Sequence, residues 1–308
     1  MKLRFITIFL LLTITLLLFC SCDESTSSST NSNYSTSSND TISKAPTSQE
    51  KDVSETDNGK YADSGELKIR IFKMGKSDAY LFRTSSKTIL IDCGDVDNSQ
   101  EILDYFTEKT LSKIDYLILT HLDKKSIGGA AAIINGLEIG TVYEPNYVKN
   151  NTEYIDYSTA LSDKNISSVK IDKLISFEAD DVKFEITPCE KSYYSDDDNY
   201  SSAISVTHGE NKFLFVGDAK SDRIKEIIAK ENIKHDFLMM PDNGALDPET
   251  ENLINAVSPT YAAITCSTKN PASNDVLSKL SSKGINTYLT VNGSIKITSD
   301  GSKILLEQ

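Results

Sequence analysis

From residue 66 onward, short apolar runs with strand periodicity alternate with helical patterns, and this alternation restricts the chain to folds in which helices cover sheets. Residues 67–72 alternate apolar and polar side chains, which predicts a strand with one buried face. Residues 114–120 are almost continuously apolar, which is typical of a strand covered on both faces. Residues 99–110 carry apolar side chains at helical spacing, with Gln and Glu near the start, and predict a helix.

The same reading extends to the rest of the chain. Further strands are predicted at residues 79–83, 88–92, 182–187, 203–207, 212–216, 237–240, 261–266 and 287–290, and further helices at 127–135, 219–231, 248–257 and 273–283. A hairpin closes the chain. Two strand-rich halves, each flanked by helices, predict an α/β (α+β) sandwich of two sheets packed face to face with helices outside.

The first residues have the form of a secretory signal. Lys2 and Arg4 precede a short apolar run at residues 6–19, which ends in Phe19-Cys20-Ser21-Cys22. A small residue directly before a cysteine resembles a bacterial lipobox. We therefore expect residues 1–21 to be a lipoprotein signal peptide and Cys22 to carry the lipid, which would hold the protein outside the cytoplasm on the bacterial cell membrane. Ordinary cleavage, with a freely secreted product, is the alternative.

Residues 22–65 are rich in Ser, Thr and Asn and contain almost nothing that could be buried, so we expect a disordered tether there and one domain at residues 66–308. That domain carries 27 Lys and Arg against 37 Asp and Glu, a net charge of −10. Phosphate affinity comes from clustered cations, so the charge argues against unaided binding of nucleic acid.

Polar residues gather where predicted strands end. Asp92, Asp218 and Asp242 each follow an apolar strand, and His121 with Asp123 follows another. If those strands share sheets, the side chains converge on one edge, where ligand sites of α/β proteins usually lie. Taken singly, any of these aspartates could instead begin a helix as its N-cap.

At this point the sequence resembles the metallo-β-lactamase superfamily, most of all the soluble domain of ComEC-type DNA-uptake proteins. The resemblance covers roughly residues 67–308. It rests on these blocks: Met74-Gly75-Lys76-Ser77-Asp78-Ala79, Leu90-Ile91-Asp92-Cys93-Gly94, Thr120-His121-Leu122-Asp123 through Ile127-Gly128-Gly129, Asn199–Val206 with Phe215-Val216-Gly217-Asp218, and Met240-Pro241-Asp242-Asn243-Gly244. It implies an αββα four-layer sandwich with a metal site at one edge, and it places Asp78 and Asp92 in the cleft.

The sequence departs from this family at the metal ligands. Relatives carry His-x-Asp-x-Asp-His before Ile-Gly-Gly, whereas Lys125 and Ser126 occupy the third and fourth positions here. The later His-His-Gly block contains Asn243 at its second position. His208 and His235 do not fill these gaps, and we expect both on the surface. The residual metal-ligand candidates are His121, Asp123, Asp218 and Asp242.

These losses bear directly on chemistry. A catalytic zinc needs three protein ligands and an open position for water. An ammonium among the ligands would repel a dication, yet it could neutralise Asp123, Asp218 or Asp242 by itself. We therefore interpret Lys125 as a substitute for the missing metal charge. The alternative is that Lys125 points into solvent.

The leading hypothesis is a surface-anchored pseudoenzyme without a cofactor, which binds an unknown protein or small-molecule ligand. The alternative is a phosphodiesterase-like or nuclease-like hydrolase with one Mn or Zn ion in an altered site, linked to DNA uptake. A third hypothesis is an accessory role beside a DNA-uptake or secretion machine. No catalytic residue is assigned from the sequence.

Overall fold

The computed structural model describes residues 61–63, 65–231 and 233–308. Residues 1–60, with the expected signal peptide, Cys22 and most of the expected tether, lie outside them. Ala62 is buried and donates its backbone N–H to the carbonyl of Thr84 at 3.1 Å. No helix among the described residues is both long enough and apolar enough to cross a membrane.

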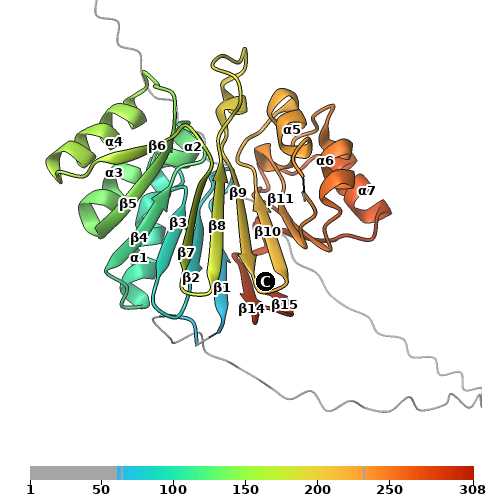
Figure 1. Cartoon of the computed structure of the whole chain (residues 1–308), viewed down its shortest axis with the longest axis horizontal. Coiled ribbons are helices and arrows are strands. Elements are labelled where there is room, and N and C mark those ends of the chain that lie inside the picture. Colours follow the sequence, from blue (N-terminus) through green and yellow to red (C-terminus); the bar gives the residue numbers. More distant parts are fainter. Residues whose placement is uncertain (1–60, 64, 232) are drawn as a thin grey trace, which may run out of the picture. The chain divides into compact units, whose positions relative to one another are not determined.

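The described residues form two mixed sheets packed face to face (Figure 1). The first has eight strands in the order β15-β14-β1-β2-β3-β4-β5-β6. Its strands are β1 Leu67–Ile71, β2 Tyr80–Arg83, β3 Thr88–Ile91, β4 Lys113–Ile118, β5 Glu138–Pro145, β6 Ser168–Ile171, β14 Ile295–Ser299 and β15 Ile304–Glu307. The closing hairpin thus pairs with the first strand, in antiparallel register from Leu67 with Ser299 to Ile71 with Ile295.

The second sheet has seven strands in the order β13-β12-β11-β10-β9-β8-β7. Its strands are β7 Ile175–Ala179, β8 Val182–Thr187, β9 Ala203–His208, β10 Asn211–Phe215, β11 Phe237–Met239, β12 Tyr261–Ile264 and β13 Asn286–Leu289. Strands β10 to β13 run parallel to one another, whereas β7 to β10 form an antiparallel meander.

Helices lie beside both sheets (Figure 1). The α-helices are α1 Ser99–Glu108, α2 Lys124–Ile127, α3 Ala130–Gly136, α4 Thr152–Asp163, α5 Ser221–Ile228, α6 Thr250–Val257 and α7 Asn274–Ser282. The described residues also form four short 3-10 helices: η1 Val96–Asn98, η2 Asp197–Tyr200, η3 Asp242–Gly244 and η4 Thr290–Asn292.

Three hydrophobic clusters show that the layers follow the order α-β-β-α. One lies between the sheets and includes Phe82 and Phe215, whose rings are 5.3 Å apart. A second joins the first sheet to α1, α3 and α4, and a third joins the second sheet to α5, α6 and α7. Alternate residues of one strand enter different clusters, as the twofold side-chain period requires. The predicted αββα sandwich is confirmed.

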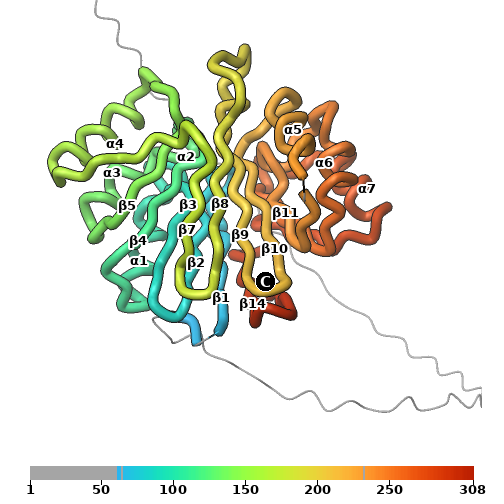
Figure 2. Tube along the Cα trace, in the orientation of Figure 1, coloured from blue at the N-terminus to red at the C-terminus, as the bar shows by residue number. Residues whose placement is uncertain are grey.

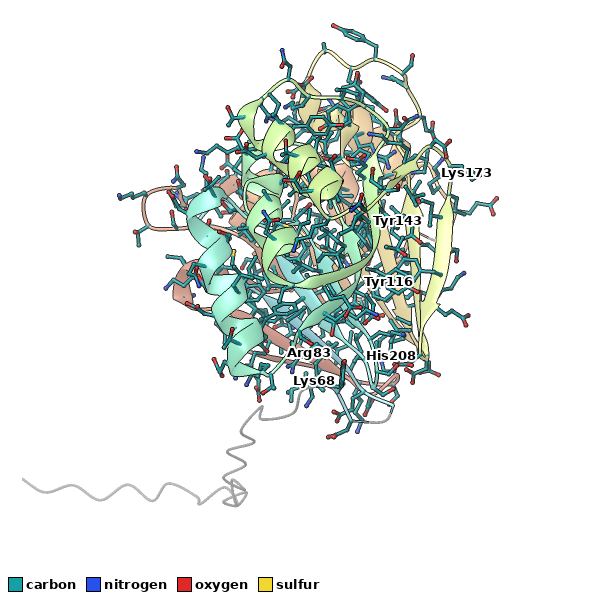
Figure 3. All side chains as sticks on the ribbon, turned by 90° about the vertical axis from the view of Figure 1, so that its left-hand side faces the viewer. Lys68, Arg83, Tyr116, Tyr143, Lys173 and His208 are labelled. Atoms are coloured by element: carbon teal, nitrogen blue, oxygen red, sulfur yellow. The ribbon has the colours of Figure 1, made fainter. Side chains whose placement is uncertain are left out.

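Residues 136–181 received no assignment from the sequence, and they contain β5, α4, β6 and β7. The two edge strands β6 and β7 meet at one side of the sandwich. There Tyr116 and Tyr143 stack with Phe177, with ring centroids 4.2 and 5.7 Å from the Phe177 ring. Figure 3 shows Tyr116 and Tyr143 one above the other along this side. Phe177 of the edge strand β7 thus packs across the sandwich onto two strands of the first sheet, β4 and β5.

Candidate functional site

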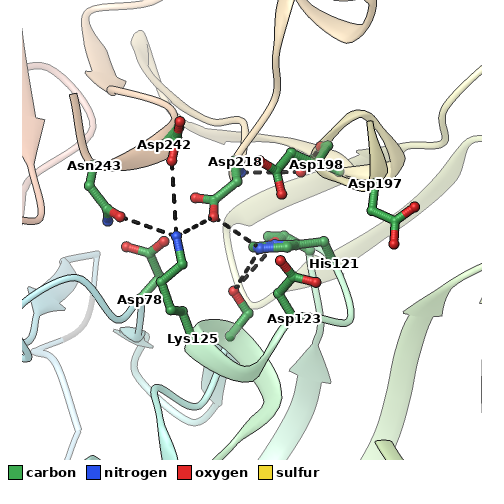
Figure 4. A network of polar contacts seen from close by, with 12 residues as sticks. Asp78, His121, Asp123, Lys125, Asp197, Asp198, Asp218, Asp242 and Asn243 are labelled. Carbon is green, nitrogen blue, oxygen red and sulfur yellow. Dashed lines mark hydrogen bonds and ion pairs between the residues drawn. The ribbon is translucent and has the colours of Figure 1, made fainter. Parts of the chain in front are cut away.

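The polar residues that follow strands meet at one edge of the sandwich. Strands β3 and β4 run parallel in one sheet, and β10 and β11 run parallel in the other, so the segments after them leave from matching ends. In Figure 2 these segments can be followed along the chain trace from the strands labelled β3, β4, β10 and β11. We use the name polar cluster for the side chains that meet there: Asp78, His121, Asp123, Lys125, Ser126, Asp218, Asp242 and Asn243 (Figure 4).

His121 and Asp218 form the buried centre of the polar cluster. The Nε2 atom of His121 lies 3.2 Å from Oδ2 of Asp218, and each side chain is 1% exposed. The Ser126 hydroxyl lies 3.2 Å from His121 Nδ1. Burial alone would lower the pKa of His121, but the charge and hydrogen bond of Asp218 outweigh burial and raise it to about 9. His121 is therefore a cation at neutral pH.

Lys125 turns into the polar cluster. Its Nζ atom lies 3.0 Å from Oδ2 of Asp218, 3.4 Å from Oδ1 of Asn243 and 3.9 Å from Oδ1 of Asp242 (Figure 4). Burial acts to lower the pKa of Lys125, but the nearby charge of Asp218 overcomes it and the net shift is upward. The geometry thus excludes the alternative in which Lys125 points into solvent.

His121 and Lys125 both contact the same oxygen of Asp218, Oδ2. Burial would raise the pKa of Asp218, but His121 and Lys125 together hold it well below its usual range. Its other oxygen, Oδ1, is buried and has no hydrogen-bond partner among the described residues. A buried acceptor without a partner is costly, so this atom marks incomplete pairing inside the polar cluster.

The two outer carboxylates are each held by a lysine from another loop. Asp123 pairs with Lys149, and Asp242 lies 3.3 Å from Nζ of Lys220. Burial, then the charge of Asp218, raises the pKa of Asp242 despite Lys220. Sequence reasoning missed both lysines, because neither lies in a motif and each reaches the polar cluster only through the fold.

Asp78 of the polar cluster and the neighbouring Asp92 are both buried. Asp92 accepts hydrogen bonds from the backbone N–H and the hydroxyl of Thr120, at 2.8 and 2.6 Å. Burial raises the pKa of Asp92 to about 7, against the lowering effect of His121. Asp78 accepts a 2.8 Å bond from Thr265, and burial followed by the charge of Asp218 raises its pKa to about 6.

The expected N-cap role of the aspartates is not general. Asp123 stands at the N-cap position of α2 but makes no capping hydrogen bond with its side chain. Asp92 and Asp242 instead have positive φ angles of 57° and 44°, and Asn243 has a φ of 53°. Residues other than glycine with this left-handed backbone conformation are strained unless the surrounding structure holds them, and such residues concentrate at functional sites.

The expectation that His208 and His235 lie on the surface is wrong. Their exposed fractions are only 3% and 7%. His208 lies 2.8 Å from the Ser299 hydroxyl, and Figure 3 places it at the same end of the domain as Lys68. His235 Nε2 lies 2.8 Å from the Ser205 hydroxyl. Each imidazole is thus buried through a hydroxyl partner that its position in the sequence does not reveal.

Comparison with known proteins identifies the fold family. A model of the family described as "Metallo-beta-lactamase superfamily" matches residues 73–262. The chain belongs to the metallo-beta-lactamase superfamily. At Lys125, Ser126 and Asn243, where the sequence comparison predicted replaced ligands, the side chains are an ammonium, a hydroxyl and an amide. Among the described residues, no group of three or more His, Cys, Asp and Glu side chains has an arrangement that could hold a metal ion.

Within the superfamily the chain is similar to competence proteins of the ComEC type. It is 27% identical over 206 residues to "Recombination protein 2" of Haemophilus influenzae. This match covers 64% of this chain and 24% of that protein. It is 21% identical over 170 residues to "ComE operon protein 3" of Bacillus subtilis. This second match covers 55% of this chain and 22% of that protein. The chain thus spans about a quarter of the length of these relatives.

A solved structure shows the same fold. The metallo-beta-lactamase fold protein YhfI of Bacillus subtilis superposes with a TM-score of 0.54 at 11% identity, and the match covers 79% of this chain and all of that one. At this identity the likeness shows the superfamily fold and nothing about the reaction.

Proposed function

We propose that this chain is a non-catalytic binding or accessory module, in which the Lys125 ammonium supplies the positive charge that metal ions supply elsewhere in the superfamily. The 3.0 Å contact between Lys125 and Asp218 carries the proposal. It puts a permanent cation on Asp218, a carboxylate that the resemblance places at a family ligand position.

The remaining donors fit the superfamily's dinuclear metal centre poorly. Asp218 already pairs with His121 and Lys125, and Asp123 and Asp242 pair with Lys149 and Lys220. A dication near Asp218 would meet the like charge of Lys125, which contacts that residue, and it would have to displace a proton from His121 before that imidazole could bind it. It would also lack the ligands that Lys125, Ser126 and Asn243 have replaced, and a zinc site needs at least three.

The proposal includes anchoring through a lipid on Cys22, at the outer face of a bacterial cell membrane. Its support is the basic start, the short apolar run and the Ser-Cys pair that ends it. A flexible tether of some 40 residues would have a typical reach of about 35 Å. Such a reach would let the domain meet partners on neighbouring membrane proteins.

The ComEC-type relatives suggest where such a module would act. They are much longer than the part that this chain matches. We propose an accessory role beside a DNA-uptake or secretion machine, with a protein or small-molecule ligand. The domain charge of −10 argues against direct capture of nucleic acid.

Metal analysis of the purified full chain tests the proposal. After equilibration with zinc and gel filtration, we expect less than about 0.1 equivalent of zinc per chain, because the ligand set is incomplete. The superfamily protein YhfI, treated in the same way, reports on losses during handling. One or two equivalents of tightly bound zinc on this chain would overturn the proposal.

A single-metal hydrolase is the second candidate, and the unpaired Oδ1 of Asp218 is the observation that favours it. This oxygen, His121, Asp123 and Asp242 would supply one nitrogen and three carboxylates, a set that suits a harder ion such as Mn²⁺. Such an ion would act as a Lewis acid toward a phosphodiester. Lys125 would first have to leave Asp218.

A phosphodiesterase assay separates the two candidates. The assay uses bis-p-nitrophenyl phosphate with added Mn²⁺ or Zn²⁺ and compares the wild type with Asp218→Ala. The non-catalytic proposal expects no turnover above that of Asp218→Ala with either ion. Turnover that requires Mn²⁺ and disappears in Asp218→Ala would establish the hydrolase.

A further inference from the structure

Three cations meet around one aromatic ring where the first sheet packs against α1. The Cζ atoms of Arg70 on β1 and Arg83 on β2 lie 4.6 and 5.8 Å from the ring centroid of Tyr105, and the Nζ atom of Lys109 lies 5.7 Å from it. We use the name cationic group for Arg70, Arg83 and Lys109. Like charges this close repel one another, so the group favours an anion beside it.

The carboxylates of α1 compensate the cationic group only weakly. Glu108 lies 3.3 Å from Lys109, but its side chain is 70% exposed, and such pairs contribute little. Burial raises the pKa of Glu101, and the charge of Arg70 opposes this only in part. Arg70 forms no ion pair with a described residue, and its Nε atom is buried without a hydrogen-bond partner among those residues.

The depth of the cationic group decides what kind of anion fits it. Arg83 is only 3% exposed, and the Lys109 side chain is 10% exposed. Bulk water solvates charges at this depth poorly, so they require polar partners from the protein, and a carboxylate is the strongest of these. Because the group is already covered, a carboxylate on an attached segment of the chain fits it better than a ligand that diffuses in.

The chain enters the domain beside the cationic group. Tyr61 packs against the hydrophobic cluster that contains Tyr105. The backbone N–H of Ala62 donates to the carbonyl of Thr84, the residue after Arg83. The segment that precedes Tyr61 is therefore delivered to the same part of the sheet.

That segment contains one carboxylate. Residues 56–60 read Thr-Asp-Asn-Gly-Lys, so Asp57 is their only acidic residue, four positions before Tyr61. Four extended residues span up to about 14 Å, which lets the Asp57 side chain reach the neighbourhood of the anchored Ala62. A short covalent link also gives this carboxylate a high effective concentration at the cationic group.

We propose that residues 56–60 dock on the first sheet, with the Asp57 carboxylate at the cationic group. The docking gives the domain a fixed exit for its tether. Arg83 pairs with Thr88 at the start of β3, whereas Asp92, beside the polar cluster, follows the end of that strand. The tether then leaves the domain at the opposite end of β3 from the polar cluster.

Trypsin digestion of the folded full chain gives the first test. The enzyme needs a locally open chain, so cleavage between Lys60 and Tyr61 reports on the docking. Asp57→Asn removes the charge and keeps the shape, and it should speed this cleavage by at least about tenfold. Cleavage after Lys51 is the internal reference and should not change. Synthetic peptides of residues 52–66 with either side chain measure the intrinsic effect of the substitution on trypsin, which is divided out.

A matched control removes a neighbouring carboxylate. Glu55→Gln lies two positions earlier and should leave the cleavage rate after Lys60 at the wild-type level. A wild-type rate in Asp57→Asn would leave the cationic group to another carboxylate or to an external anion such as inorganic phosphate, and it would overturn the proposal. Faster cleavage in Glu55→Gln alone would assign the contact to the wrong residue and refute it as well.

A lysine pair gives the second test from the side of the sheet. Lys109→Met should also speed cleavage after Lys60, and the double variant with Asp57→Asn should be no faster than the faster single variant, because both remove one contact. The matched control is Lys113→Met, since Lys113 is 42% exposed and pairs with Glu138 at 3.2 Å. Multiplied effects in the double variant, or an equal effect of the control, would refute the assignment.

Thermal melting of each variant, followed by circular dichroism, verifies that the domain is folded at the digestion temperature. Neither digestion depends on zinc content or on a lipid anchor, so this inference and the proposed function fail separately.

Discussion

Two buried ion pairs of this domain differ in how completely their polar atoms are bonded. In the first, Arg223 is fully buried and all three of its guanidinium nitrogens donate: Nη1 to Glu226 at 2.9 Å, Nε to the carbonyl of Ser201 at 2.8 Å and Nη2 to the carbonyl of Thr187 at 2.8 Å. Glu226 also accepts the Tyr194 hydroxyl at 2.6 Å. The planar fork of an arginine suits such complete bonding.

The second pair, Lys125 with Asp218, is less complete. The Lys125 side chain is 30% exposed, and its three acceptors lie at increasing distances from 3.0 to 3.9 Å. The Oδ1 atom of Asp218 has no partner among the described residues, although it is buried. A flexible ammonium balances the charge here without saturating the hydrogen bonds.

The difference separates a pair that holds structure from one that lies at the centre of the polar cluster. The Arg223 side chain connects α5 to the end of β8 and to the segment between β8 and β9, and each of its guanidinium nitrogens donates a hydrogen bond. The polar cluster retains strained backbone at Asp242 and Asn243 and an unpaired oxygen, both of which suit ligand binding better than stability.

The largest expected effect comes from breaking the saturated pair. Arg223→Met leaves Glu226 buried without its cation, so the free energy of unfolding should fall by about 3–5 kcal/mol. Urea denaturation followed by circular dichroism measures it. The double variant Arg223→Met with Glu226→Leu also removes the unpaired carboxylate, and it should recover part of the lost free energy of unfolding. A loss below about 1 kcal/mol would contradict the structural role of this pair.

The next effect should come from rebuilding the incomplete site. The double variant Lys125→Asp with Ser126→His restores two ligand types of the superfamily and removes the repelling ammonium. Its zinc affinity should exceed that of the wild type by at least about 100-fold, measured by competition with a chelating dye.

The chain offers a matched control for this change at the neighbouring residue. Lys124 is 61% exposed and pairs with Asp95, outside the polar cluster. Lys124→Asp therefore makes the same change in charge one residue away, and zinc affinity should stay at the wild-type level. An equal gain in both variants would mean that general acidity, and not the ligand position, controls zinc binding.

A smaller effect should appear with pH. Because the pKa of Asp92 is raised to about 7, its protonated form favours the folded state, and that stability is complete below about pH 4 and lost as the pH rises through 7. Asp92→Asn removes this dependence. Between pH 5 and 8 the free energy of unfolding of the wild type should fall relative to that of the variant, by on the order of 2 kcal/mol. Parallel profiles would show that Asp92 does not titrate in this range.

Much of the sandwich could be predicted from the sequence because its inner strands are strongly apolar. Residues 88–92 and 114–120 are recognised by composition alone; β3 falls within the first range, and β4 overlaps the second but begins one residue earlier, at Lys113. The missed segment at residues 136–181 is different in kind. Strand β5 begins with exposed residues at alternate positions and contains Gly140, and β6 and β7 are half-exposed edge strands. Their pairing comes from neighbours in space more than from local preference.

The polar cluster was predictable only in part. The residues after the strands could be named, because parallel strands deliver their ends to one edge. The direction of Lys125 remained open, since sequence spacing does not fix where a long side chain ends. Lys149 and Lys220, which hold Asp123 and Asp242, lie on loops that only the tertiary fold brings together. His235 was misjudged for the same reason, because Ser205 lies 30 positions away.

The pairing of β1 with β14 has a consequence for biogenesis. One edge of β1 stays unsatisfied until residues 295–299 are available, since Leu67 pairs with Ser299. A ribosome must translate the chain at least as far as residue 299 before the larger sheet can close, and a contact so distant along the chain slows folding. Until then the hydrogen-bonding groups on that edge of β1 lack their native partners.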